Sequence, residues 1–62
     1  MFVIRHKTTG YYLASVPSKS IEFRHSPNEQ DAVRFDTEKA AEWERHTFDS
    51  FSGAWMSVEV AA

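Results

Sequence analysis

The 62-residue sequence contains no cysteine and only two glycines and two prolines. Without cysteine, no disulfide can stabilise the fold and no Cys-based zinc site can form. With glycine only at Gly10 and Gly53, the chain has no P-loop and no G-x-G-x-x-G turn for a nucleotide. No serine lies in a G-x-S-x-G elbow. These absences predict a protein that is not an enzyme and holds no cofactor.

Long apolar runs and paired histidines are also absent. No segment approaches the roughly 20 apolar residues that span a bilayer, and the apolar run near Phe2 is too short for a signal peptide. We therefore expect a cytoplasmic protein without a membrane partner. His6, His25 and His46 form no H-x-x-x-H or H-E-x-x-H pair, so we predict no metal site.

Aromatic residues, at 15% of the sequence, are the main resource for a core. A chain of this length is one domain, residues 1–62, and buries only about 60% of the surface that its unfolded state exposes. Aromatic side chains each bury a large area, and a homodimer would add further stability. The protein is expected to be a monomer or a homodimer.

Strand patterns predict a small sheet. Two β-rich runs flank Gly10, which predicts a hairpin whose turn uses a positive φ at that glycine. Residues 21–24 alternate, so we expect a third strand with Ile21 and Phe23 facing inward. Residues 54–60 alternate as a final strand, and two orientations remain open. Trp55 is either an exposed interface anchor, with Met56 inside, or lies inside, with Met56 outside.

Two helix starts follow in the middle of the chain. Ser26, as an N-cap with Glu29 three residues later, predicts a brief helix or 3₁₀ turn that leads into a short extended segment. Thr37 or Asp36 caps the main helix, expected over residues 37–46.

Helical periodicity predicts which side of the main helix is buried. The expected core stripe is Ala40, Trp43 and Thr47. Glu44 is expected to flank this stripe. The expected outer side carries Glu38, Glu42 and Arg45. The predicted fold class is α+β, a small antiparallel sheet of three to five short strands with one main helix packed on a face.

Charge is divided unevenly along the chain. Residues 1–27 carry a net charge of +3, from four cations and one carboxylate. Residues 28–62 carry −5, from three cations and eight carboxylates, which gives the overall −2. Such an asymmetry can create a local field even when the total charge is small.

Three segments form a recognisable pattern, namely residues 9–13 (TGYYL), 31–35 (DAVRF) and 37–41 (TEKAA). In this pattern, over about half its length, the chain resembles small, uncharacterised phage- and prophage-encoded α+β proteins. The resemblance implies a setting in a host cell, where compact phage proteins often bind and block a host protein. Anti-CRISPR inhibitors are one such group, and several resemble nucleic acid in charge.

The leading hypothesis is a non-enzymatic, phage-derived inhibitor of a host complex that handles nucleic acid, such as CRISPR–Cas. Its acidic surface would compete with nucleic acid for a basic groove, because carboxylates on a rigid frame present charge as phosphates do. The expected partner-binding residues are Glu29, Asp31, Asp36, Glu38, Glu42, Asp49 and Trp55.

Two alternatives remain. One is a small nucleic-acid-binding module that uses basic and aromatic residues of the first half, namely Arg5, Lys7, Tyr12 and Arg24. The sequence pI of about 5.8 argues against it, since nucleic-acid-binding domains are usually strongly basic. The other alternative is a structural accessory protein of a phage. The charged outer side of a helix is also what solubility alone would produce.

Overall fold

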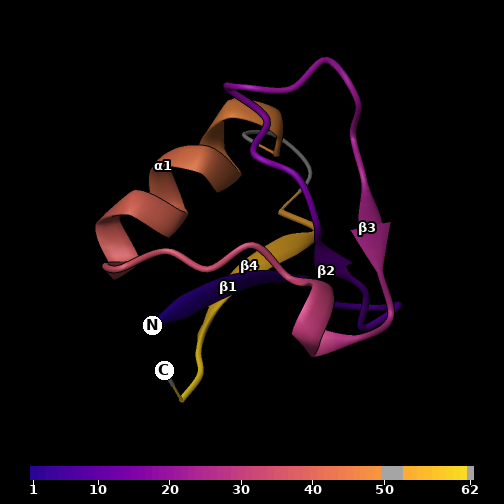
Figure 1. The fold of residues 1–62 in the computed structure, drawn as a ribbon, viewed down its shortest axis with the longest axis vertical. Helices are drawn as coiled ribbons and strands as arrows, with labels where there is room; N and C mark the ends of the chain where they lie inside the picture. Colours follow the sequence, from indigo (N-terminus) through magenta and orange to yellow (C-terminus); the bar gives the residue numbers. More distant parts are fainter. Residues whose placement is uncertain (50–52, 62) are drawn as a thin grey trace.

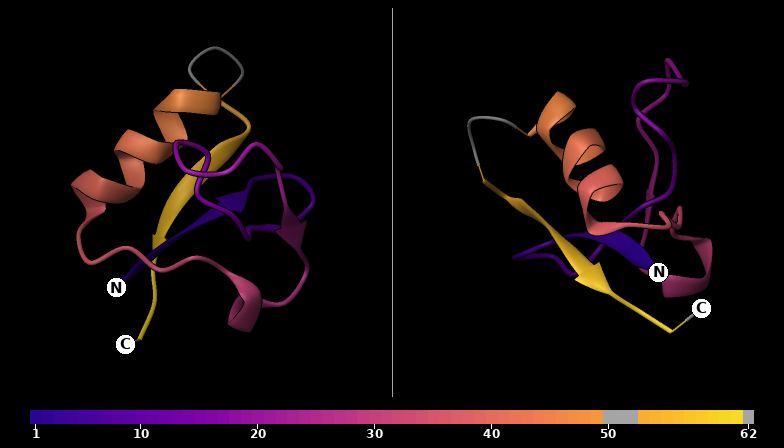
Figure 2. Two further views of the ribbon diagram at one scale, coloured as in Figure 1. Left: turned by 45° about the horizontal axis from the view of Figure 1, so that its top comes forward. Right: turned by 90° about the vertical axis from the view of Figure 1, so that its left-hand side faces the viewer.

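A computed structural model describes residues 1–49 and 53–61 (Figure 1). The elements, in chain order, are strands β1 (Phe2–His6), β2 (Tyr12–Leu13) and β3 (His25–Ser26), the 3₁₀ helix η1 (Glu29–Asp31), helix α1 (Glu38–Phe48) and strand β4 (Trp55–Glu59). The strands form one antiparallel sheet in the order β3-β2-β1-β4. Helix α1 packs on one face of the β1–β4 pair (Figure 2). The predicted α+β class is therefore confirmed.

The hairpin between β1 and β2 forms as expected. Gly10 has a φ of 77°, which only glycine adopts without steric cost. The Gly10 N–H donates to the His6 carbonyl at 3.1 Å, and the His6 N–H donates to the Tyr11 carbonyl at 2.7 Å. These bonds set Arg5 opposite Tyr12 in the sheet.

An extended segment after η1 continues the sheet beside β1. Phe2 and Phe35 exchange two backbone hydrogen bonds, each of 2.8 Å, and the Val33 N–H donates to the Leu13 carbonyl at 3.0 Å. The expected 3₁₀ turn and extended segment are both confirmed. The expected capping box is not formed, because the Ser26 hydroxyl donates to Asp31, at 2.7 Å, instead of capping a helix with Glu29.

The third strand lies later than the alternation predicted. Residues 21–24 form no strand, and Ile21 is fully exposed rather than buried. The reason is the Ser15 hydroxyl, which accepts from the Arg24 N–H at 3.0 Å and donates to the Glu22 carbonyl at 3.1 Å. These side-chain bonds replace the regular ladder, as serine often does near loops. Phe23 is also exposed, although its ring contacts Phe48.

The core lies between the sheet and α1. Ile4, Leu13 and Ala41 are fully buried at its centre. Partly buried aromatic rings pack around them, namely Phe2, Phe35, Phe48 and Trp55. Small Ala41 allows the helix to approach the sheet closely, so the short chain builds its core from few residues.

Trp55 takes the inward of its two possible orientations. Its ring contacts His6 at 4.9 Å and Phe48 at 5.6 Å, measured between ring centroids. Met56 points to the other side of the sheet and is 39% exposed. Trp55 is therefore a half-buried part of the core rim, so the fully exposed orientation is not formed, and its role in partner binding stays a prediction.

Helix α1 starts as predicted but buries a different side. The Thr37 hydroxyl accepts from the Ala40 N–H at 3.1 Å, which caps the helix, and the last helical residue lies two positions beyond the expected end. The buried residues are Ala41 and Glu44 instead of Ala40, Trp43 and Thr47. Trp43 is 67% exposed, so its expected place in the core is wrong.

A membrane-spanning helix is not found among residues 1–49 and 53–61, where no helix has the length and apolar character to cross a bilayer.

Candidate binding groove

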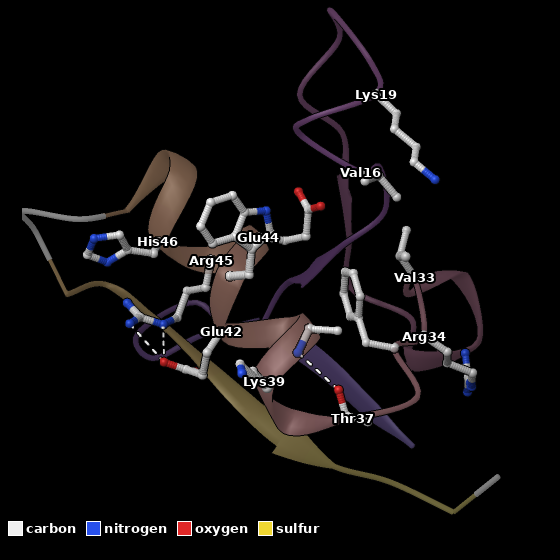
Figure 3. A pocket seen from close by; sticks show the side chains of 13 residues that line it. Val16, Lys19, Val33, Arg34, Thr37, Lys39, Glu42, Glu44, Arg45 and His46 are labelled. Atoms are coloured by element: carbon white, nitrogen blue, oxygen red, sulfur yellow. Dashed lines mark hydrogen bonds and ion pairs between the residues drawn. The ribbon is translucent and has the colours of Figure 1, made fainter.

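An open groove of about 870 Å³ runs along α1. It lies between the helix, the loop that follows β2 and the segment that leads into the helix (Figure 3). Figure 3 shows Lys19, Val16, Val33 and Arg34 on the side opposite His46, Arg45 and Glu42. The lining residues are Val16, Lys19, Val33, Arg34, Phe35, Thr37, Lys39, Ala40, Glu42, Trp43, Glu44, Arg45 and His46.

The floor of the groove is apolar. Val16 comes from the loop, Val33 and Phe35 come from the extended segment, and Ala40 comes from the helix. Trp43 stands one turn further along α1 on the same flank as Ala40. A large, exposed aromatic side chain beside an apolar floor is the arrangement found at ligand and peptide sites.

The position of Trp43 follows from the packing of its neighbours. Residues 41, 44 and 48 share one side of the helix, and burying them turns residue 43 away from the sheet. The wall that faces Trp43 is the loop after β2, which the buried Glu44 carboxylate holds. Glu44 Oε2 accepts from the Ser18 hydroxyl at 2.8 Å, and Oε1 accepts from the Ser18 N–H at 3.3 Å.

The side chains that line the groove carry a net positive charge, from Lys19, Arg34, Lys39 and Arg45 against Glu42 and Glu44. Ser18 is neutral, so its bonds to Glu44 position that carboxylate without cancelling its charge. Among the described residues no ion pair involves Lys19 or Lys39, and both are exposed. Arg34 forms an ion pair with Glu29, with 3.8 Å between the guanidinium nitrogen and the carboxylate oxygen.

A small ionic cluster joins α1 to the start of β4. Arg45 donates through Nε to Glu42 at 3.0 Å, and its guanidinium lies 3.7 Å from Asp49. The hydrogen bond from Arg45, followed by one from Ser57, lowers the pKa of Glu42 below its ordinary value. The same bond raises the pKa of Arg45. Both predicted outward-facing residues of this pair therefore lie against the sheet.

The predicted acidic contact residues do not all reach the surface. Asp49 is only 4% exposed, so its expected outward orientation is wrong. Its carboxylate accepts from the backbone N–H of Trp55 at 2.8 Å and from that of Ala54 at 3.3 Å. Asp49 therefore holds the backbone at the beginning of β4 in place.

The other predicted carboxylates lie in two separate places. Glu29 and Asp31 belong to η1, whereas Asp36 and Glu38 lie at the start of α1, at the other end of the connecting segment (Figure 1). Asp31 is bonded to Ser26, and only Asp36 and Glu38 lack a side-chain partner among the residues described. The structure therefore separates the expected acidic set.

Three of the basic and aromatic residues of the nucleic-acid-binding hypothesis lie on one face of the sheet. Arg5 pairs with Tyr12 in the sheet register, and both alternate away from Ile4 and Leu13, which face α1. The Arg24 carbonyl accepts from the Ala14 N–H at 2.8 Å, which sets Arg24 on the same face. Lys7 lies beyond β1 in the turn.

Metal binding has no candidate in the described part of the chain, where no group of three or more His, Asp or Glu side chains could hold an ion. Comparisons with protein-family models, curated proteins and solved structures found no match to this chain. The resemblance to phage-encoded proteins thus stays a prediction from its hairpin and helix motifs.

Sequence reasoning missed the groove. Its floor and walls come from three segments, residues 16–19, 33–37 and 39–46, which only the fold brings together. One signal was present, because an acidic residue at position 44 lies on the same helical side as Ala41 and Phe48. A carboxylate on the buried side requires a hydrogen-bonding partner, and therefore a packed loop, over that side.

Proposed function

We propose that this protein is a non-enzymatic binding protein whose groove along α1 receives an extended, apolar peptide segment with flanking carboxylates. The observation that carries the proposal is Trp43, which is 67% exposed next to an apolar floor. Tryptophan is enriched among residues that dominate binding energy at interfaces. Leaving it in water has a hydrophobic cost that a bound segment would remove.

The form of the groove supports a peptide rather than a small, enclosed ligand. It is open along the helix, and Val16 and Val33 face it from segments other than α1. Grooves of this kind hold side chains that alternate along a bound chain. The exposed ammonium groups of Lys19 and Lys39 at its margins favour carboxylates in the partner.

The partner class differs from the one predicted from sequence. Competition with nucleic acid requires carboxylates in one patch, and Asp36 with Glu38 is the pair that remains for that role. A host complex that handles nucleic acid fits this proposal as a target if it presents an acidic segment of its own. The contact surface is then the groove instead of the acidic side of the helix.

A synthetic peptide series tests the proposal. The probe carries leucine and phenylalanine flanked by glutamates, and its control carries lysines in place of the glutamates. We expect fluorescence anisotropy to detect binding of the acidic probe and not of the control. Trp43→Ala should weaken the binding by about 2 kcal/mol, the loss typical of an interface hot spot. Tyr11→Ala, which truncates an exposed aromatic outside the groove, should not change it.

The proposal fails if the acidic and basic probes bind equally, or if Trp43→Ala binds as tightly as the wild type. If the acidic probe binds and Trp43→Ala weakens its binding, the physiological partner can be sought from host lysate with Trp43→Ala as the negative bait. A genuine groove ligand is retained by the wild type and lost with this variant.

A second candidate function is nucleic-acid binding on the sheet face that points away from α1. The observation that favours it is the gathering of Arg5, Tyr12 and Arg24 on that face. Tyrosine can stack on a base while arginine contacts the backbone. A gel-shift titration with single-stranded nucleic acid at low salt tests it. Binding that weakens steeply with salt and is lost in Tyr12→Ala would support it.

A further inference from the structure

The two outer edges of the sheet differ in their protection. Strand β3 has two residues and is followed by Pro27, which cannot donate a hydrogen bond. Strand β4 has five residues and contains neither proline nor lysine. Short strands, proline and lysine are the usual devices that prevent edge strands from pairing with other chains. Strand β3 carries such protection, and β4 carries only the charge of Glu59.

The outer edge of β4 presents unpaired backbone groups. The Lys7 N–H donates to the Ala54 carbonyl and the Val60 N–H donates to the Met1 carbonyl, each at 2.8 Å. The antiparallel ladder therefore directs even-numbered residues toward β1 and turns Ser57 and Glu59 outward. Within residues 1–49 and 53–61, no hydrogen bond reaches the N–H or carbonyl groups of Ser57 and Glu59.

One end of this edge is closed by a side chain. The Trp55 N–H also points outward, and it donates to the Asp49 carboxylate at 2.8 Å. Asp49 is buried, so this bond is fixed in place. It leaves the Trp55 carbonyl as an acceptor and defines where pairing along the edge can begin.

The side chains of β4 that point away from α1 are apolar. Met56 is 39% exposed, and Val58 is partly exposed beside the buried Val3, its register partner. No charged side chain of β4 lies on this face, since Glu59 alternates to the other one. An exposed apolar row along an unpaired edge is the surface that a further strand would cover.

We propose that β4 pairs antiparallel with β4 of a second copy of this chain, so that two sheets join into one. Full overlap of the five-residue strand places its middle residue, Ser57, on the two-fold axis. Both backbone groups of Ser57 then bond to those of Ser57 in the second copy. At each end of the overlap the Trp55 N–H stays bound to Asp49, so the hydrogen bonds between the two copies are centred on Ser57.

A second copy fits this edge because its side chains complement themselves in that register. Met56 lies opposite Val58 of the second copy, and the reverse pair follows from the two-fold symmetry. Apolar cross-strand pairs of this kind stabilise antiparallel sheets. Both α1 helices lie on one face of the joined sheet. The loop and the extended segment that form the other walls of the groove, residues 16–19 and 33–37, come from outside β4, so the groove remains open in each copy.

The oligomeric state of the whole chain tests the proposal. We expect analytical ultracentrifugation to find a reversible dimer of the wild type. Ser57→Pro removes an outward N–H without breaking a bond to β1, and proline is tolerated at such edge positions. It should raise the dimer dissociation constant at least about tenfold, because both hydrogen bonds between the two Ser57 residues are lost together. Ser57→Ala, which loses the hydroxyl but keeps the N–H, is the matched control and should dimerise as the wild type does.

A second variant acts through side chains instead of the backbone. Met56→Lys places an ammonium group between Arg5, its register partner, and Val58 of the second copy. It should also raise the dissociation constant about tenfold while circular dichroism shows an unchanged fold. A wild type that stays monomeric at millimolar concentration overturns the proposal. So does a dimer that survives both variants, or one that Ser57→Ala disrupts as strongly as Ser57→Pro.

Discussion

Glu44 and Ser18 join helix α1 to the loop that forms the far wall of the groove. Glu44 is 8% exposed, and its carboxylate accepts hydrogen bonds from the hydroxyl and the backbone N–H of Ser18, at 2.8 and 3.3 Å. The loop from residue 14 to residue 24 has little regular structure of its own. These two bonds therefore fix the distance between the helix and the loop, and with it the width of the groove.

Replacing Glu44 should destabilise both the fold and the groove. Glu44→Ala leaves the Ser18 donors without their acceptor and opens a space beside Ala41. We expect the free energy of unfolding to fall by about 1–3 kcal/mol, the cost of an unmade hydrogen bond at a buried site. Glu44→Gln keeps an acceptor for Ser18 and should lose less. Urea denaturation measures both variants, and equal losses would show that the hydrogen bonds to Ser18 contribute little.

The two tryptophans should respond in opposite ways to truncation. Trp43→Ala removes an exposed side chain and should change the free energy of unfolding by no more than about 0.5 kcal/mol. Trp55→Ala removes a ring that packs on His6 and Phe48, and it should cost about 3 kcal/mol.

Fluorescence separates the same two residues. The wild-type emission should lose its solvent-exposed, red-shifted component in Trp43→Ala and its blue-shifted component in Trp55→Ala. A large stability loss in Trp43→Ala would contradict its exposed position. It would place this tryptophan in the core, as the helical periodicity first indicated.

Local signals in the sequence predicted much of the fold. The glycine at position 10 required a turn, Thr37 required a helix start, and both form with the expected bonds. Each of these features depends on a few neighbouring residues. The sheet and helix of the α+β class could therefore be predicted without knowing how they pack.

The orientation of the helix could not be predicted in this way. Helical periodicity predicts a core stripe of Ala40, Trp43 and Thr47, with the large Trp43 at its centre. The sheet instead accepted small Ala41 at close range, with Glu44 beside it, once Ser18 satisfied the carboxylate. A contact across 26 positions of sequence decided which side was buried, and no local pattern contains it.

Asp49 shows the same limit at the candidate site. Aspartate is usually a surface residue, and the sequence hypothesis counts Asp49 among the acidic contacts. The fold brings it to the backbone of Trp55, where a carboxylate is needed as an acceptor. The predicted acidic contact residues therefore do not form one patch, because tertiary hydrogen bonds that composition does not reveal bury Asp49.

Stability should depend on pH through Glu42. Its pKa lies below the ordinary value of 4.5 in the folded state because Arg45 and Ser57 hydrogen-bond to the carboxylate. A carboxyl with a lowered folded pKa stabilises the protein above its unfolded pKa. That contribution is lost as the pH falls through the folded pKa. The melting temperature should therefore decline below pH 4.5, and Glu42→Gln should reduce the decline.

The size of this effect is limited by solvent, since the Glu42 side chain is 42% exposed. Thermal melts of the wild type and Glu42→Gln across the acid range measure it. Arg45→Lys is a useful companion, because lysine keeps the charge and loses the geometry of the Nε bond. If the wild type and Glu42→Gln show parallel pH curves, the bond between Glu42 and Arg45 does not stabilise the folded state.

Neighbouring residues of opposite charge at the start of α1 distinguish the groove from the acidic surface. Lys39 lines the groove, whereas Glu38 does not and belongs to the predicted acidic contacts. If the groove binds an acidic segment, Lys39→Glu should weaken binding about fivefold, the effect of losing one exposed charge pair, and more so at low salt. Glu38→Lys should leave the affinity unchanged or raise it slightly.

Both variants should remain folded, although Glu38→Lys loses up to about 1 kcal/mol of interaction with the helix dipole. Anisotropy titrations at two salt concentrations decide the matter, with Glu22→Lys as a charge reversal outside both surfaces. If Glu38→Lys weakens binding and Lys39→Glu does not, the carboxylates are the contact surface and the groove is rejected.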